Sequence, residues 1–509
     1  MVRTHLHTRG GRAVRSLTGL LGVTVALALG PSGPAVAHTD TDSGRVWTAV
    51  GAGDWAAAYD AKDVGAFPHD EIGSGVDTGP TDALAPEPDA DSDADSDADS
   101  ADYAGSGSVW YVDPLGSDTG PGSQARPWRS IARAVRTAPP GATISVAAGS
   151  YAPFTITRPG QTVASSGDGD VVVTGAAGVQ DVVRIAARDA TLAGLTVTGC
   201  VPNSSPRGGF EENGSSGVRI DAAATDVTVR DTTVRDSRST NDAGLPFGCY
   251  GIFVRGADGS RLLDNDISGN GAGIYFNGGG RGAQVVANRI HDNDVIIRNT
   301  RAHPNDDFGA SAIAFTNLTS TPGPTATANV ISGNAGPSSD YETDGGAFEI
   351  YNASHLRIHG NTLDGNENVL ETGTGAGGAC VDNTFTGNTA TGRPPGGVAW
   401  SKGLILRCAT GMQITGNDFL EVDWWVFVVD TGDEFSTGVR GLTIADNTIA
   451  QWQKVYHLGV DPVAEDVTID GNRLHFTGPV FASYADGTTS SSVAEWRERT
   501  GLDVTSTEY

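Results

Sequence analysis

Two glutamates hold equivalent places in consecutive segments of the chain. Glu349 lies twelve residues before Asn361, and Glu371 lies twelve residues before Asn383. Each glutamate sits in a short stretch that alternates apolar and polar side chains, which is typical of a strand with one buried face. If the segments stack as parallel strands about 4.8 Å apart, the two carboxylates lie side by side. Such a pair is costly unless one carboxyl is protonated or a cation lies between them, so the arrangement favours a function.

The first function that this pair allows is glycoside hydrolysis. Paired carboxylates cleave glycosidic bonds with retention when they are about 5 Å apart, and with inversion when they are farther apart. Adjacent strands favour the short separation for Glu349 and Glu371. In the wider arrangement Asp306, Asp307 or Asp344 would supply the second carboxylate.

Two other functions remain open on the same residues. In a polysaccharide lyase, a cation or an arginine neutralises a uronate and a side chain removes the C5 proton. The candidates for these steps are Arg407, Lys402, Tyr351 and His303. Glu349 and Glu371 would then hold Ca²⁺, which binds carboxylate oxygens. The third alternative is a non-catalytic protein that binds glycans or has a structural role at a surface.

Further polar and aromatic residues share the predicted outer face with the glutamates. Aromatic rings can stack on sugars, and polar groups can bond sugar hydroxyls. Aligning the strands on their turn residues gives the outward positions Arg219, Asp221, Phe253, Arg255, Tyr275, Asn277, Ala314, Thr316, Glu349, Tyr351 and Glu371, with Arg407 in line with Tyr351. Long loops would form walls and add His303, Asn305, Asp306, Asp307, Asp340, Tyr341 and Asp344. The predicted catalytic residues are Glu349, Glu371, Asp344, Arg407 and Lys402, and the predicted substrate-binding residues are Arg255, Tyr275, Asn277, His303, Asp306, Asp307, Tyr341 and Tyr351.

The elements that would position these residues recur along the chain. A turn residue, usually asparagine, falls between two short apolar segments at intervals of 22 to 41 residues. A repeat of this size that cannot bury its own apolar face indicates a solenoid. The side-chain amides would stack as an internal ladder, each bonding to the next repeat. The predicted series is Asp231, Asn265, Asn288, Asn329, Asn361, Asn383, Asn417, Asn447 and Asn472.

The start of the repeat region carries a resemblance to a known family. A strand at Trp110-Tyr111-Val112, a GSD…GPG loop, a Pro-Trp pair, a helix from Trp128 to Val135, and the segments PPGATI (with a strand at 143–146) and AAGSY follow one another. Together they resemble the N-terminal cap of right-handed parallel β-helix proteins of the pectate-lyase-like superfamily, and the resemblance continues to about Gly487. It implies an all-β, right-handed parallel β-helix with short helical caps and a polysaccharide groove along the first sheet. The fold by itself does not choose among the three functions.

The regions around the β-helix have distinct compositions. Residues 1–37 predict a signal peptide, with four arginines before the apolar stretch Leu17–Leu29 and a small-residue cleavage site at Ala35-Val36-Ala37. Residues 38–72 carry no assignable pattern, and residues 73–107 form an acidic low-complexity linker. The β-helix is predicted for residues 108–487, and a C-terminal cap with a short helix at Val493–Arg499 for residues 488–509. We expect a secreted monomer with no later membrane span.

Charge and cysteine content limit the partners further. The formal net charge of −28 argues against nucleic acid, which requires a basic footprint. A polyanionic substrate would need arginines or a bound cation to invert the field locally. The four cysteines allow three disulfide pairings. We expect Cys200–Cys249 and Cys380–Cys408, because the members of each pair lie one or two repeats apart.

Overall fold

The computed structural model describes residues 108–509, except 302–306, 341, 376, 393–401, 423, 431, 433–434 and 463–464, together with four strands between residues 15 and 48. The chain divides into two compact units, residues 1–63 and 64–509. In the first unit an antiparallel sheet contains, in order, β1 (Arg15–Thr18), β2 (Thr24–Gly30), β3 (Gly33–Asp40) and β4 (Arg45–Thr48). The predicted signal peptide overlaps these strands, and its removal stays a prediction. The predicted linker lies outside the described residues.

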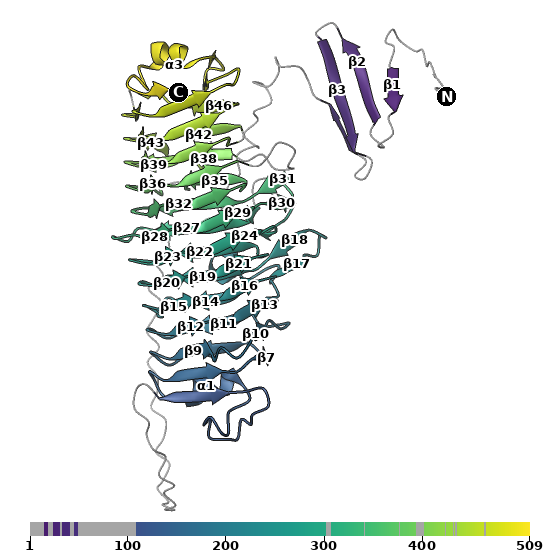
Figure 1. Ribbon diagram of the computed structural model, residues 1–509, viewed down its shortest axis with the longest axis vertical. Helices are drawn as coiled ribbons and strands as arrows, with labels where there is room; N and C mark the ends of the chain where they lie inside the picture. The colour runs from purple at the N-terminus through teal and green to yellow at the C-terminus, as the bar shows by residue number, and fades with distance from the viewer. Residues whose placement is uncertain are drawn as a thin grey trace, which may run out of the picture. The chain divides into compact units, whose positions relative to one another are not determined.

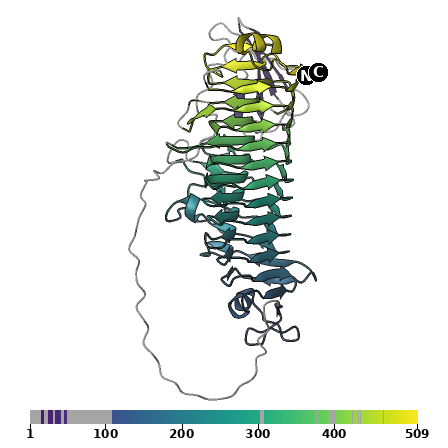
Figure 2. The ribbon, with the colours of Figure 1, turned by 90° about the vertical axis from the view of Figure 1, so that its left-hand side faces the viewer.

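The second unit is a parallel β-helix, as predicted. Its described residues form three sheets of 13 strands, and each sheet is filled in sequence order. The chain visits the first, second and third sheets in turn and then returns to the first, one rung farther along (Figures 1 and 2). Within these sheets only β49 and β50 pair antiparallel among the described residues.

The strands of the three sheets are short, because each spans one flat side of a rung. The first sheet contains β8 (Phe154–Ile156), β11 (Asp181–Ile185), β14 (Ser216–Ile220), β19 (Tyr250–Arg255), β22 (Ala272–Asn277), β27 (Ser311–Leu318), β32 (Gly346–Ala353), β35 (Asn368–Gly373), β38 (Lys402–Leu406), β42 (Trp425–Val429), β46 (Lys454–Leu458), β49 (Ala482–Tyr484) and β50 (Thr489–Ser490). The second sheet contains β5 (Val109–Val112), β6 (Thr143–Val146), β9 (Thr162–Ser165), β12 (Thr191–Ala193), β15 (Thr228–Arg230), β20 (Arg261–Leu263), β23 (Gln284–Val286), β28 (Thr325–Thr327), β33 (Arg357–His359), β36 (Thr384–Thr386), β40 (Gln413–Thr415), β44 (Thr443–Ala445) and β47 (Thr468–Asp470). The third sheet contains β7 (Gly149–Tyr151), β10 (Val171–Thr174), β13 (Thr196–Thr198), β16 (Thr233–Arg235), β21 (Asp266–Ser268), β24 (Arg289–His291), β29 (Val330–Ser332), β34 (Thr362–Asp364), β37 (Thr389–Thr391), β41 (Asp418–Leu420), β45 (Thr448–Gln451), β48 (Arg473–Phe476) and β51 (Thr507–Glu508).

Loops on the outside of the β-helix form smaller elements. A four-stranded sheet contains β17 (Arg238–Thr240), β18 (Pro246–Gly248), β25 (Ile296–Arg298) and β26 (Phe308–Gly309). Two further pairs are β30 (Gly336–Ser338) with β31 (Glu342–Asp344), and β39 (Cys408–Thr410) with β43 (Gly438–Arg440). The helices are α1 (Ile131–Thr137), α2 (Phe210–Asn213) and α3 (Val493–Thr500). Among the described residues, no helix is long and apolar enough to cross a membrane.

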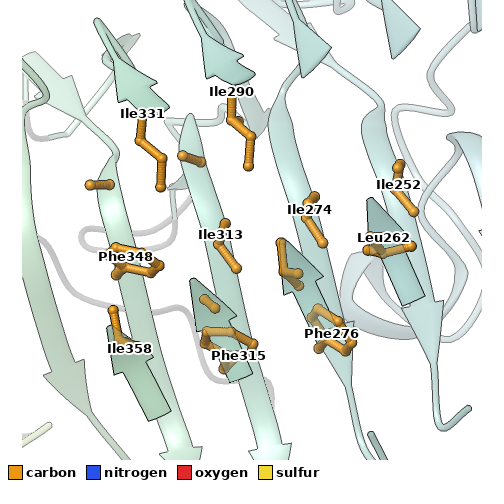
Figure 3. Packing of buried hydrophobic residues seen from close by; sticks show 14 of the residues in the cluster. Ile252, Leu262, Ile274, Phe276, Ile290, Ile313, Phe315, Ile331, Phe348 and Ile358 are labelled. Carbon is orange, nitrogen blue, oxygen red and sulfur yellow. The ribbon is translucent and has the colours of Figure 1, made fainter. Parts of the chain in front are cut away.

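Stacked apolar side chains fill the interior of the β-helix. Ile252, Ile274, Ile313 and Phe348 are register partners on successive strands of the first sheet, and all are buried (Figure 3). Each rung alone could not bury these side chains, whereas stacking removes both faces of every layer from water. The alternation seen in the sequence therefore reports which side of each strand points inward.

A ladder of buried asparagines supports one corner, with two corrections to the predicted series. Asn361 donates to Asn388 at 2.9 Å, and Asn388 donates to Asn417 at 3.1 Å, so Asn388 and not Asn383 is the ladder residue. Additional residues in the turn after β35 shift the spacing in this rung. Asp231 is also outside the ladder, because its side chain is half exposed. The backbone N–H of the next residue, Thr232, donates to Asn265 Oδ1 at 3.1 Å instead. A second ladder, which the sequence analysis missed, contains Asn270, Asn293, Asn334 and Asn366.

Both ends of the stack are covered. The N-terminal helix begins at Ile131 rather than at the predicted Trp128, because the Ser130 side chain caps it by accepting the Arg133 N–H. At the other end, the predicted C-terminal helix is confirmed as α3. Its buried Trp496 stacks on Tyr456 with 4.7 Å between ring centroids and so shields the last apolar layer.

Both predicted disulfides are confirmed. Cys200 is bonded to Cys249, and Cys380 is bonded to Cys408. Each bridge joins segments from different turns of the solenoid, so it limits how far those turns can separate in the unfolded chain.

Candidate active site

The predicted outer row of the first sheet is continuous in register. Glu349 in β32 is the direct partner of Glu371 in β35, as predicted. The two glutamates therefore lie on neighbouring strands, about 4.8 Å apart at the backbone. The same row continues on one side through Ala314, Tyr275, Phe253 and Arg219, and on the other through Ile405, Val428 and His457.

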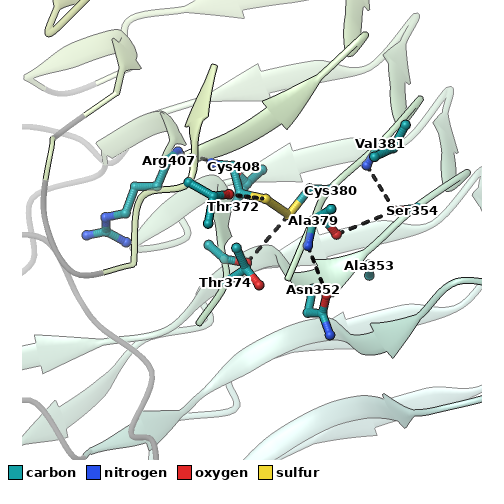
Figure 4. The surroundings of a disulfide bond; sticks show 12 residues. Asn352, Ala353, Ser354, Thr372, Thr374, Ala379, Cys380, Val381, Arg407 and Cys408 are labelled. Carbon is teal, nitrogen blue, oxygen red and sulfur yellow. Dashed lines mark hydrogen bonds between the residues drawn. A yellow bond between two sulfur atoms is a disulfide. The ribbon is translucent and has the colours of Figure 1, made fainter. Parts of the chain in front are cut away.

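The carboxylate of Glu371 is held by a buried cation. Arg407, whose side chain is fully buried, donates from Nη1 to Glu371 Oε1. Asn368 donates from Nδ2 to Glu371 Oε2 at 2.9 Å. Figure 4 shows the Arg407 side chain extending away from the disulfide between Cys380 and Cys408. This disulfide holds the backbone of Cys408, the residue that follows Arg407. The guanidinium thus compensates the negative charge of Glu371 inside the protein.

The partly exposed carboxyl group of Glu349 is protonated at neutral pH. Its pKa is raised to about 8, first by burial and then by the negative charge of Glu371. The hydrogen bond from Ser311 Oγ to Glu349 Oε2, at 2.6 Å, and the Arg407 charge oppose this rise. Both conditions that the sequence analysis set for a stable glutamate pair are therefore met: one carboxyl carries a proton, and the other has a cationic partner.

Asp344 adds a third carboxyl group to the site. It ends β31, in the short hairpin that follows the third-sheet strand β29. Burial raises the pKa of Asp344 well above its usual range, and the charges of Glu349 and Glu371 raise it further. The backbone N–H of Gly345 donates to Asp344 Oδ1 at 2.7 Å and partly offsets these effects. The three predicted catalytic carboxyl groups thus interact electrostatically at one place.

The wall hairpin beside this site is anchored by a buried aspartate. Asp307 accepts hydrogen bonds from the backbone N–H groups of Thr300 and Ser339, both at 2.7 Å. Ser338 Oγ also donates to Asp307, at 2.9 Å. The Asp307 side chain is buried, and burial raises its pKa. Asp307 therefore braces the wall from inside, and the expectation that it faces the groove is wrong.

Two basic residues predicted for the groove have acidic partners. The Nζ atom of Lys402 lies 3.7 Å from Glu367 Oε1, and the Lys402 side chain is largely buried. Arg255 donates to Glu212 of the covering helix α2 at 2.8 Å. Asn277 also binds this covering segment, since its Nδ2 donates to the Glu211 carbonyl at 2.6 Å.

An outer apolar cluster covers the N-terminal half of the row. It contains Tyr250, Phe253, Ala272, Tyr275, Ile297, Phe308 and Ala314, with Phe210 of α2 packed against it. Tyr275 is only 4% exposed, and so is Tyr351 beside the carboxyl groups. The expectation of an open aromatic row is therefore wrong at Phe253, Tyr275 and Tyr351. At Phe253 and Tyr275 the reason is that Phe210 and Phe308, from segments distant in sequence, pack against the row.

Three predicted site residues lie outside the described part of the chain, and two residues of the site were not predicted. His303, Asp306 and Tyr341 lie outside the described residues. Ser311 and Asn368, which bond the two glutamates, were missed. Both occupy positions three residues before the outward row, since Ser311 pairs with Gly346 and Asn368 pairs with Lys402. An odd offset of three residues belongs to the inward face in a strictly alternating strand, so the sequence pattern gave no signal for either residue.

The part of the chain that the structure describes does not form a metal centre. Among the described residues, no group of three or more His, Cys, Asp or Glu side chains is arranged to hold a metal ion. The two glutamates would supply oxygen ligands for Ca²⁺, but Arg407 already occupies the role of the compensating cation at Glu371.

Comparison with known proteins supports the fold. Residues 216–419 match the family described as "Right handed beta helix region". The chain is a right-handed parallel β-helix protein. The xylose complex of XylC is 9% identical, with a TM-score of 0.50 over 79% of this chain and 86% of that one. Pectate lyase Pel9A is 14% identical, with a TM-score of 0.37 over 68% of this chain and 76% of that one.

A curated relative covers a smaller part of this β-helix protein. The uncharacterized protein YwoF of Bacillus subtilis is 25% identical over 215 residues, which are 38% of this chain and 44% of YwoF. The match thus spans less than half of that relative. The family match and the likeness to XylC confirm, at the level of the fold, the right-handed β-helix that the N-terminal motifs predicted.

Proposed function

We propose that this β-helix protein hydrolyses glycosidic bonds of a polysaccharide at Glu349 and Glu371. The observation that carries the proposal is the contrast between these neighbouring carboxyl groups. Glu349 has a pKa of about 8 and holds a proton at neutral pH. Glu371 is bonded to the buried guanidinium of Arg407. A protonated acid beside a charge-compensated carboxylate is the combination that glycoside hydrolysis requires.

Each carboxyl group has a distinct role in this proposal. Glu349 donates its proton to the glycosidic oxygen as the bond to the anomeric carbon breaks. The carboxylate of Glu371 attacks that carbon and forms a glycosyl ester, which water then hydrolyses while Glu349 takes back a proton. The adjacent strands favour the short carboxyl separation, so we expect retention of configuration. Asp344 adds a third carboxyl group to the site, and the charges of Glu349 and Glu371 raise its own pKa.

The side chains proposed for elimination are less suited to their task. Arg407 is fully buried and bonded to Glu371, so it does not reach a sugar. Lys402 lies beside Glu367. A base for C5 proton abstraction must come within hydrogen-bond reach of the substrate. These contacts favour hydrolysis over β-elimination.

We also propose that the protein acts outside the cell. Residues 1–37 have the pattern of an export signal, and both disulfides suit an oxidising compartment. A soluble glycan polymer is an expected substrate in that location.

The test uses the mature chain with a panel of neutral and uronate polysaccharides, with and without EDTA. Hydrolysis releases reducing ends without ultraviolet absorbance, and the products should first appear with retained configuration by proton NMR. Glu349→Gln should lower kcat by about 10²- to 10⁴-fold, which is the usual contribution of general acid catalysis. Glu498→Gln, on the exposed face of α3, is the matched control and should leave kcat unchanged.

Three results would contradict the proposal. An unsaturated, ultraviolet-absorbing product would show elimination. Loss of cleavage with EDTA would support a bound Ca²⁺ ion. Binding of a glycan without any cleavage would show a non-catalytic protein.

A further inference from the structure

A group of aromatic and basic residues lies on the same outer face, beyond the carboxyl site. Trp425 starts β42, and its register partner in β46 is Lys454. His457 occupies the row of Glu349 and Glu371, three strands beyond Glu371. At the spacing of neighbouring strands this is a separation of about 14 Å. An oligosaccharide of a few residues lying along the sheet would therefore reach both places.

Lys454 is the unusual member of this group. The chain contains 61 acidic residues and only three lysines, which are Lys62, Lys402 and Lys454. Lys402 lies beside Glu367, whereas no carboxylate of the described residues forms an ion pair with Lys454. Instead its ammonium lies over the Trp425 ring, 4.5 Å from the centroid. Burial lowers the pKa of Lys454, so keeping this cation half-buried costs free energy that no anion of the described chain offsets.

Trp424 and Trp425 form a stacked aromatic pair at the start of β42. Trp424 is partly exposed, and its ring stacks on the buried Trp425 ring with 4.6 Å between centroids. Trp424 has a φ of 71°, a left-handed conformation that aromatic residues rarely adopt. Strained backbone of this kind persists where the surrounding structure fixes it, and it is enriched at ligand sites.

His457 completes the group from the next outward position. Its ring lies edge-on to Trp425, with centroids 6.0 Å apart, and its Nδ1 is 2.9 Å from Ser483 Oγ. Burial and the Lys454 charge both lower the pKa of His457, so the ring is neutral at neutral pH. The group therefore brings one cation, a neutral imidazole and a partly exposed indole into contact with the same Trp425 ring.

We propose that Trp424, Lys454 and His457 form a subsite for an acidic sugar residue of the polysaccharide. The sugar ring would lie against Trp424, and its carboxylate or sulfate group would bond the Lys454 ammonium, with His457 beside it. An acidic sugar suits both groups, because its ring face can pack on the exposed indole and its anionic group can compensate the half-buried ammonium. This inference rests on the proposed function for the identity of the ligand as a glycan, and it adds the class of sugar.

The experiment measures binding, so that it is independent of cleavage. Full-length mature protein carrying Glu349→Gln is titrated calorimetrically with a galacturonic acid hexamer, a sulfated chondroitin hexamer and uncharged cellohexaose. We expect the acidic hexamers to bind at least 10-fold more tightly than cellohexaose. The stronger of the two acidic ligands identifies the anion as carboxylate or sulfate.

Variants then locate the contact. Lys454→Gln should weaken binding of the preferred acidic hexamer about 10-fold or more, and Lys454→Arg should retain most of it. Arg473→Gln is the matched control, because Arg473 also lies over an aromatic ring, 4.8 Å from the Tyr509 centroid, but on the third sheet. It should not change binding.

Two further results decide the remaining cases. If Lys454→Gln does not fold, the salt dependence of the Glu349→Gln parent replaces it, and affinity for the acidic hexamer should fall as salt rises. Equal binding of acidic and neutral hexamers, or unchanged affinity in a folded Lys454→Gln variant, overturns the subsite. Neither result bears on cleavage, whereas a failure of glycan cleavage with intact acidic binding would overturn only the proposed function.

Discussion

The two halves of one outer row differ in what covers them. Between Arg219 and Ala314 the outward row carries Phe253 and Tyr275, and α2 with the loop around Phe308 packs over them as a second apolar cluster. On the next two strands the same row carries Glu349 and Glu371, beside Asp344. The backbone register is the same in both halves, so the difference comes from side chains and from the loops above them.

The comparison indicates that the covered half raises the pKa of Glu349 in the polar half. Glu349 acts electrostatically on both Tyr250 and Tyr275, so the carboxyl group lies close to the apolar cluster. Burial is the largest cause of the raised pKa of Glu349. A water-excluding neighbour on one side and a compensated carboxylate on the other together keep the proton on Glu349.

The largest expected effect is on the polar half. Arg407→Met removes the buried partner of Glu371 and should destabilise the protein by about 3–5 kcal/mol, because an uncompensated charge remains buried. Thermal unfolding measures this. The control Arg440→Met breaks the exposed pair with Glu465, at 3.4 Å, and should cost less than about 1 kcal/mol. Equal losses of stability in the two variants would show that the buried Arg407–Glu371 pair contributes no more than an exposed ion pair.

On the covered half, Phe253→Ala should cost about 3 kcal/mol or more, because it opens a cavity under α2. The same change admits water toward Glu349, so the alkaline limb of the activity profile should move to lower pH. Leu115→Ala, at a position that is 94% exposed, is the stability control. An unchanged pH profile in a destabilised Phe253→Ala variant would mean that the two halves are independent.

A third prediction concerns pH and stability. The folded protein holds the Glu349 proton up to a pKa of about 8, whereas the unfolded chain loses it near the ordinary value of 4.5. Between these values the folded state binds more protons, so stability should fall as pH rises through this window, by up to about 1.4 kcal/mol per pH unit. Glu349→Gln should flatten this dependence in melting curves recorded from pH 4.5 to 8. A slope unchanged by the substitution would assign it to other groups.

The smallest effect is expected at the border between the halves. Arg255→Ala breaks the exposed ion pair with Glu212, which should change stability by less than about 1 kcal/mol. Glycan affinity, measured by titration, should also change little if Arg255 serves to dock α2. A large loss of affinity without a loss of stability would instead restore Arg255 as a substrate-binding residue.

The sequence by itself determined the solenoid and the register of its outer row. Alternating apolar residues and buried asparagines repeat in every rung, and parallel stacking converts this local pattern into neighbouring positions. The pairing of Glu349 with Glu371 was predicted correctly, although the alignment behind it took Asn383 as the counterpart of Asn361. The rule fails where a turn changes length, and so Asn361 meets Asn388 rather than Asn383.

Only the tertiary structure decided which outward positions reach solvent and which charges are compensated. Tyr275 is covered by Phe210 and Phe308, which come from loops many residues away, and no periodic pattern encodes that contact. The Arg407–Glu371 pair and the position of Lys454 over the Trp425 ring also depend on contacts between different rungs. Burial and electrostatic partners are set by such long-range packing, and they determine the protonation states on which the proposed chemistry depends.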